Sequence, residues 1–155
     1  MNRFVLLLSL AGLVGGCAMS ASEPPAQQAM GLASLAGTSW VATDLAPVAG
    51  SADQRRATPS LKFISLTQVA GHGGCNGYSG KAEIEGDALR LGPLASTRKL
   101  CPGPAMEVET AFFKALEHVR KARLTGSAGN AGQRGRVLEL LDPAGTPVLS
   151  LQRVD

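Results

Sequence analysis

One segment of this chain has a helical pattern, whereas its other patterned segments are short and strand-like. Between Pro104 and Val119 the apolar residues Val108, Phe112, Leu116 and Val119 recur at spacings of three and four, which places them on one face of an amphipathic helix. Alternating, β-branched or apolar runs occupy residues 39–45, 61–67, 81–85, 88–91, 137–141 and 148–154. The sequence therefore predicts a mainly β fold class with one α-helix and antiparallel strands.

Turn residues and aromatic residues refine this prediction. Glu85 to Asp87 separate two predicted strands, and Asp142 to Gly145 separate the last two, as hairpins require. Aromatic residues make up only 4% of the chain, although 45% of it is hydrophobic. Since only the helix offers a long apolar stripe, we expect Trp40 to be buried together with Phe112 and Leu116.

The first residues are typical of an export signal. A cationic start at Arg3 precedes an apolar run from Phe4 to Val14 and then small residues. As a helix, this run would span roughly 16 Å, about half of a bilayer core of roughly 30 Å. We therefore expect a signal peptide at residues 1–16 rather than a retained membrane helix.

The end of this run resembles the bacterial lipobox. Gly16 precedes Cys17 as the small residue of that motif, and the resemblance implies that Cys17 is acylated, with palmitate-type chains, and becomes the first mature residue. Ala18 in place of Asp resembles the sorting signal for the outer membrane, which predicts a lipid-anchored protein facing the periplasm. The alternative is an ordinary signal peptide that contains a cysteine and releases a soluble exported protein.

Composition then divides the rest of the chain. Residues 17–34 are small and polar, with a Pro-Pro pair and no period, and are predicted to be a flexible tether before a domain at residues 35–155. The Gly-rich residues 125–136 are interpreted as a solvated hairpin extension rather than a mobile binding loop. The chain has 15 basic and 12 acidic residues, and removal of the signal peptide with Arg3 leaves 14 basic and 12 acidic residues, a small positive net charge. Its basic clusters are short and contain no interleaved aromatic residues, which excludes a nucleic-acid partner.

Residues 71–80, GHGGCNGYSG, form the most unusual stretch. A dinucleotide-binding turn requires glycine at its first, third and sixth positions and a following helix, but Asn76 occupies the sixth position and no helix follows. The glycines instead favour a backbone role, with positive φ angles or close packing. Asn76 is expected in a left-handed conformation, bonded to neighbouring amides.

Two further interpretations of this stretch involve side-chain chemistry. Cys75 as a nucleophile would need His72 or His118 as its base, but no known cysteine-histidine-acid signature is matched. A zinc site would combine these three residues with Cys101, without the paired spacing of structural sites. We expect His72 in an exposed turn and His118 at a solvated helix end, with no catalytic residue, metal or cofactor.

The region from Leu35 to Asp155 resembles the META domain family, in several elements that occur in the same order. They are Leu35-x-Gly37-x-x-Trp40, Leu61-x-Phe63, Gly71-x-x-Gly74-Cys75-Asn76 with Gly80, Leu91, Gly92 and Thr97 before Cys101, Met106-x-x-Glu109-x-x-Phe112 with Leu116, and Leu138-x-Leu140-x-Asp142-x-x-Gly145. The chain departs from the pattern at residues 98–100, where family members often carry Met-Ala just before the cysteine.

The resemblance implies a strongly curved antiparallel sheet or barrel packed on the single helix, without established enzymatic activity. It also implies family motif or structural roles for Trp40, Gly74, Cys75, Asn76, Thr97, Cys101, Met106 and Glu109. Cys75 and Cys101 lie in paired family elements, and they are the two cysteines that remain after Cys17 in an exported chain. We therefore expect a disulfide between them.

Members of this family are associated with envelope stress, heat shock and resistance to certain antibiotics. The leading hypothesis is thus a non-enzymatic envelope lipoprotein that supports stress tolerance by binding another envelope component, such as a protein. The alternative is a small-ligand-binding module with a cavity in the curved sheet. An interior filled by Trp40, Phe63, Phe112 and Phe113 would leave no ligand site, whereas a cavity of about 300 Å³ or more would favour one.

Overall fold

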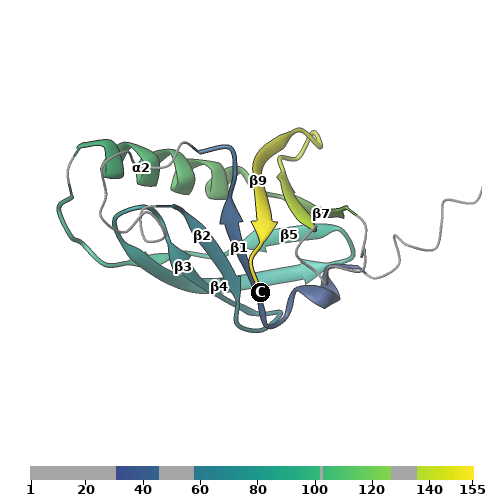
Figure 1. Cartoon of the computed structure of the whole chain (residues 1–155). Coiled ribbons are helices and arrows are strands. Elements are labelled where there is room, and N and C mark those ends of the chain that lie inside the picture. The colour runs from purple at the N-terminus through teal and green to yellow at the C-terminus, as the bar shows by residue number, and fades with distance from the viewer. Residues whose placement is uncertain (1–30, 46–57, 102, 127–135) are drawn as a thin grey trace, which may run out of the picture.

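The computed structural model describes residues 31–45, 58–101, 103–126 and 136–155. The predicted signal peptide, Cys17 and most of the predicted tether lie outside these ranges, as does most of the Gly-rich segment 125–136. The described residues form an antiparallel sheet with a single α-helix (Figure 1), which confirms the predicted fold class. No helix within the described ranges has the length and hydropathy that a membrane span requires.

The elements follow one another closely along the chain. Their bounds are η2 (Leu32–Leu35), β1 (Thr38–Ala42), β2 (Ser60–Phe63), β3 (Gln68–His72), β4 (Gly77–Glu85), β5 (Ala88–Leu91), β6 (Ala95–Ser96), α2 (Gly103–His118), β7 (Lys121–Thr125), β8 (Val137–Leu141) and β9 (Pro147–Arg153). The predicted helix corresponds to α2, and the six predicted strands correspond to β1, β2, β4, β5, β8 and β9. Strands β3, β6 and β7 were not predicted.

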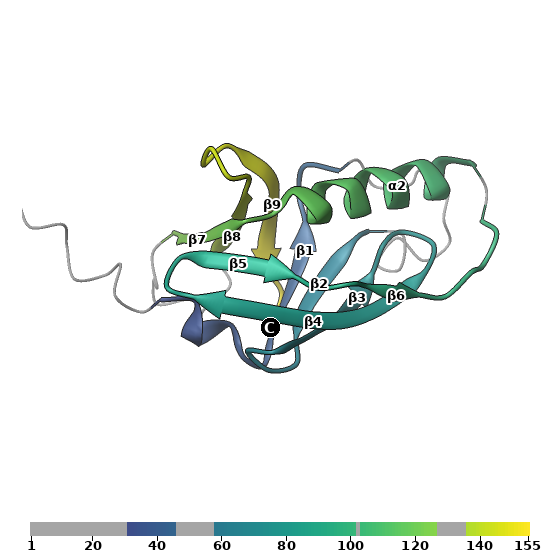
Figure 2. The same ribbon diagram turned by 180° about the vertical axis from the view of Figure 1, so that it is seen from behind.

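The sheet curves until it closes on itself. Its strand order is β3-β2-β1-β9-β8-β7-β5-β4-β6, and β3 also pairs with β4. Among the described strands, eight therefore form a ring, and β6 lies beside β4 outside it. The helix α2 lies over one side of the curved sheet in both views (Figures 1 and 2). This arrangement is the strongly curved antiparallel sheet that the family resemblance implied.

The two predicted hairpins are confirmed. Strands β4 and β5 are joined at Gly86 and Asp87, with Glu85 opposite Ala88, and Gly86 takes a positive φ of 60° that suits this tight turn. Strands β8 and β9 pair along their lengths. In their turn, the Gly145 amide donates to the Asp142 carbonyl at 3.0 Å.

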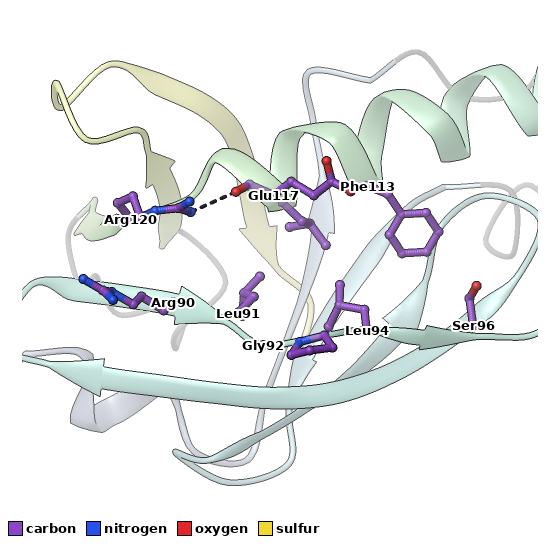
Figure 3. A pocket seen from close by; sticks show the side chains of 10 residues that line it. Arg90, Leu91, Gly92, Leu94, Ser96, Phe113, Glu117 and Arg120 are labelled. Carbon is purple, nitrogen blue, oxygen red and sulfur yellow. Dashed lines mark hydrogen bonds between the residues drawn. The ribbon is translucent and has the colours of Figure 1, made fainter.

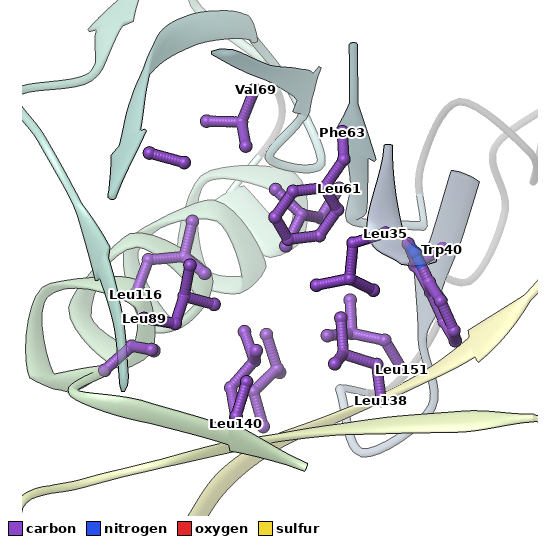
Figure 4. Packing of buried hydrophobic residues seen from close by; sticks show 14 of the residues in the cluster. Leu35, Trp40, Leu61, Phe63, Val69, Leu89, Leu116, Leu138, Leu140 and Leu151 are labelled. Carbon is purple, nitrogen blue, oxygen red and sulfur yellow. The ribbon is translucent and has the colours of Figure 1, made fainter. Parts of the chain in front are cut away.

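The core fills the inside of the ring with leucines and four buried aromatic side chains, Trp40, Phe63, Tyr78 and Phe112. Figure 4 shows Trp40 and Phe63 among the leucines. Leu116 belongs to the same cluster, so the predicted joint burial of Trp40 with the helix face is confirmed. The Trp40 Nε1 donates to Thr38 Oγ1 at 2.6 Å. Thr38 Oγ1 in turn donates to the Leu35 carbonyl at 2.6 Å, so the polar atom of the tryptophan is satisfied within the core.

The predicted boundary between tether and domain is placed too late. Residues Leu32–Leu35 form the 3₁₀ helix η2, and both Leu32 and Leu35 are buried against the main core. Ordered structure therefore begins before residue 35. The sequence pattern missed this turn because one helical turn is too short to show a period.

Candidate functional site

The glycine-rich stretch 71–80 belongs to a β-hairpin, and only its residues 73–76 form the turn. Strand β3 extends to His72, β4 begins at Gly77, and the Gly73 amide donates to the Asn76 carbonyl at 2.8 Å across the connection. A Cβ atom at Gly71 would lie 2.0 Å from the Ser60 carbonyl oxygen. This glycine thus allows neighbouring backbone to approach within the sheet, as expected for a residue without a side chain.

Tyr78 occupies the space beside Gly71. Its buried hydroxyl donates to the Ser60 carbonyl at 2.9 Å, and a Cβ atom at Gly71 would lie 2.7 Å from that hydroxyl. Burial raises the pKa of the Tyr78 phenol above its ordinary value. The phenol therefore stays protonated and acts as a fixed structural donor.

Asn76 is the centre of the site, although not in the conformation predicted. No described residue other than glycine has a positive φ, so Asn76 is not left-handed, and the positive φ of this turn belongs to Gly74 at 125°. The Asn76 residue is 3% exposed. Its Oδ1 accepts from Thr97 Oγ1 at 2.8 Å and from the Lys99 amide at 2.7 Å.

The Asn76 Nδ2 atom makes two further hydrogen bonds. It donates to Glu109 Oε1 at 2.9 Å and to the Lys99 carbonyl at 3.3 Å. A primary amide offers two acceptor positions and two N–H donors, so all four are used. The Asn76 side chain binds both main-chain polar groups of Lys99, as a neighbouring strand would.

Glu109 connects α2 to this hairpin. It is 7% exposed, and its Oε2 accepts from the backbone amides of Cys75, at 3.1 Å, and Asn76. The carboxylate of Glu109 thus leaves the helix surface and binds the hairpin turn. A buried carboxylate is tolerated here because N–H donors replace the water that it loses.

The disulfide completes the site. Cys75 and Cys101 are joined, with their Cα atoms 5.9 Å apart, inside the range of about 4.4–6.8 Å that bridged cysteines adopt. Met106 packs beside this pair in a small cluster of its own. We call Cys75, Asn76, Thr97, Cys101 and Glu109 together the Asn76 clamp.

The two histidines are not part of the clamp. His72 is half-buried in β3 rather than in an exposed turn, and its Nδ1 accepts from the Gly74 amide at 3.2 Å. His118 is exposed at the end of α2, as expected, with its Nδ1 2.7 Å from the Lys114 carbonyl. Within the described ranges, no three His, Cys, Asp or Glu side chains are grouped as a metal site would require.

The clamp fixes a segment that has almost no regular structure of its own. Residues 97–100 follow the two-residue strand β6 and are exposed. Asn76 nevertheless binds their backbone at Lys99 and the side-chain hydroxyl of Thr97. The Thr97 amide donates to the Gly77 carbonyl at 3.0 Å, and the disulfide holds Cys101. Leu100, between these attachments, is 97% exposed. The arrangement therefore holds a short loop in one conformation and directs an apolar side chain into solvent.

Comparison with known proteins identifies the family. The family model described as META domain matches residues 33–155. The chain belongs to the META domain family. Among the predicted motif residues, Gly74 and the five residues of the Asn76 clamp lie together at the hairpin turn of this META domain. Trp40 instead lies in the main core.

Two solved structures have a similar fold to this META domain. One, described as the NMR structure of the protein from Burkholderia xenovorans, has a TM-score of 0.59 and 25% identity, and the match covers 94% of this chain and 99% of that one. A second, described as the NMR structure of the protein, has a TM-score of 0.51 and 20% identity, covering 77% of this chain and 91% of that one. No curated protein matches the chain.

Replacing Glu109 with glutamine is expected to destabilise the META domain by about 1–3 kcal/mol, the cost of an unmet buried polar group. The new NH₂ group would face N–H donors from which the carboxylate now accepts hydrogen bonds. Urea unfolding measures this change. Glu107→Gln, at an exposed position on the same helix, is the control and should stay within about 0.5 kcal/mol. Equal stability of the two variants would show that the Glu109 hydrogen bonds contribute nothing.

Proposed function

We propose that this META domain protein is a non-enzymatic lipoprotein of the bacterial envelope, which supports stress tolerance by binding another envelope component. The observation that carries the proposal is Leu100, which is 97% exposed on a loop that the Asn76 clamp holds in place. An apolar side chain on a preformed loop loses little conformational entropy on binding. We infer that Leu100 is the centre of the contact surface.

The charges beside Leu100 indicate the kind of partner. Arg98 and Lys99 are both exposed, and neither side chain forms an ion pair within the described part of the chain. Cationic side chains around an apolar contact favour an acidic surface and speed its association. The proposed partner is therefore an envelope protein with an apolar pocket that is bordered by acidic residues.

The sequence supports the envelope setting. The predicted acylation at Cys17 and the tether of residues 17–34 would keep the domain close to the periplasmic face of the outer membrane. The disulfide between Cys75 and Cys101 fits an oxidising compartment of this kind. Anchoring also raises the local concentration of the domain near other envelope proteins.

The arrangement of polar groups supports binding rather than catalysis. In the clamp, both sulfur atoms are bonded to each other and the Asn76 and Glu109 side chains are bonded to protein groups. The alternative, a ligand inside the curved sheet, has less support because Trp40, Phe63 and Phe112 fill that interior.

Replacing Leu100 with aspartate is expected to abolish the stress protection. A strain without the gene would be tested under heat, oxidants and antibiotics, with the wild type or variants supplied on a plasmid. Leu100→Asp should fail to restore survival, because it places a charge at the proposed contact. Ile64→Asp, at a position that is 53% exposed in the β2–β3 connection, is the matched control and should restore survival.

Two further arms complete this experiment. Cys17→Ser separates the contribution of the anchor from that of the domain. Photo-crosslinking from position 100 should give one reproducible adduct that is lost when Arg98 and Lys99 are both replaced by glutamate. Full protection by Leu100→Asp at normal protein levels would refute the proposed surface.

A further inference from the structure

An open cleft of about 600 Å³ lies between the C-terminal half of α2 and the segment that connects β5 to β6 (Figure 3). It arises where two neighbouring strands of the ring have their shortest pairing. Strands β5 and β7 are paired only at Ala88 and Lys121, so residues after Ala88 move away from β7. The last turns of α2 form the opposite wall.

The cleft has an apolar floor. Leu91, Leu94 and Phe113 are half-buried and pack against the main core, and Leu116 beside them is buried. Gly80 allows Leu94 to lie close to β4, since a Cβ atom there would come within 2.6 Å of Leu94 Cδ2. The floor is therefore fixed by packing and does not need a ligand to form.

One end of the cleft is cationic. Figure 3 shows Arg90 and Arg120 at the same end, away from Leu94 and Ser96. The Arg120 Nη1 donates to the main-chain carbonyls of Glu117, at 2.8 Å, and Val119, at 2.6 Å. These bonds fix the guanidinium plane at the helix end, and its Nε and Nη2 make no hydrogen bond within the described residues.

Neither arginine of the cleft lies within ion-pair distance of a carboxylate in the described part of the protein, and the register partner of Arg90 on β4 is Glu83. Arg90 is exposed and forms no ion pair there. Glu117 lines the cleft, but its carboxylate pairs with neither Arg90 nor Arg120. Two guanidinium groups next to an apolar floor thus combine attraction for an anion with a surface for a hydrocarbon chain.

We propose that this cleft binds a single-chain amphiphilic anion. Its carboxylate or phosphate head group would bind Arg90 and Arg120, and its hydrocarbon chain would lie on Leu91, Leu94 and Phe113. The planar fork of donors on arginine matches both head groups, and the volume falls within the range of about 300–1,000 Å³ that small-molecule sites occupy. This site is separate from the Leu100 surface, so it does not depend on the proposed partner.

The test is a titration of the full mature chain, carrying Cys17→Ser to keep it in solution, followed by amide NMR. Dodecanoate and dodecyl phosphate, each below its micelle concentration, are the probes, and they distinguish a fatty acid from a phosphorylated lipid. We expect saturable shifts at Leu91, Leu94 and Phe113 with at least one probe. Monododecanoylglycerol has the same chain without a charge. Its affinity should be lower by at least about tenfold, because a charged hydrogen bond is lost.

Arg90→Glu should weaken binding of the charged probe by about tenfold or more, since it replaces an attractive charge by a repulsive one. The Arg90 side chain makes no hydrogen bond or ion pair within the described residues, so this variant should fold normally, which its melting temperature would verify. Lys62→Glu, on the exposed face of β2, makes the same charge change away from the cleft and should bind as the wild type. Unchanged binding by Arg90→Glu, equal binding of the neutral probe, or shifts confined to other surfaces would overturn the proposal.

Discussion

Replacing Phe112 with alanine is expected to lower the free energy of unfolding by about 3–5 kcal/mol, the usual cost of removing a buried aromatic side chain. Phe112 is fully buried, and its ring lies 5.8 Å from that of Tyr78. It is the largest side chain through which α2 enters the core. Because small domains are stable by only about 5–15 kcal/mol, such a loss would leave a marginal or unfolded protein.

Urea unfolding at constant pH measures this effect. Lys114→Ala, two residues along the same helix and exposed, is the control and should change the stability by no more than about 0.5 kcal/mol. An unchanged midpoint for Phe112→Ala would mean that α2 does not dock against the core through this face.

Loss of the disulfide is expected to have an effect of similar size. Cys75 and Cys101 are 26 residues apart, and closing a loop of this length stabilises the folded state by roughly 3–4 kcal/mol in the chain-entropy model. Reductant should therefore lower the melting temperature of the wild type. It should not change the melting temperature of the Cys75→Ala, Cys101→Ala double variant, which already lacks the bond.

Peptide mapping without reductant should recover the two cysteine peptides as one linked species. The protein for this measurement should come from the cell envelope, so that the redox state is the native one. Free titration of both thiols in that material would contradict the disulfide and with it the closed form of the Asn76 clamp.

Most strands and the helix could be predicted because their patterns are local. Strands β5 and β8 match their predicted ranges, and α2 is displaced by one residue. Strand β7, with the sequence KARLT, carries two cations and no clear alternation, yet it pairs at five positions with β8. Its conformation is set by that neighbour, which a single segment cannot reveal.

The Asn76 clamp was predicted as a set of residues but not as an arrangement. Glu109 is 33 residues from Asn76 in sequence, and no local pattern indicates that its carboxylate turns towards a hairpin. The resemblance to the META domain family supplied the members of the set. The hydrogen bonds that join them depend on how α2 crosses the sheet.

The clamp also explains why the sequence can depart from the family pattern at residues 98–100. Asn76 binds the main-chain N–H and carbonyl of Lys99 rather than its side chain. The side chains of this loop can therefore vary while its backbone stays fixed. The proposed contact surface around Leu100 requires such a loop, with a fixed backbone and side chains that are free to differ.

Amide hydrogen exchange at residues 98–100 tests the central claim, that the Asn76 clamp fixes this loop. The Lys99 amide donates to Asn76 Oδ1 at 2.7 Å, whereas the amides of Arg98 and Leu100 donate no hydrogen bond within the described residues. In the oxidised wild type, the account predicts a protected Lys99 amide between two neighbours that exchange fast, and loss of that protection in folded Asn76→Ala. A Lys99 amide that exchanges as fast as its neighbours in the wild type would contradict it.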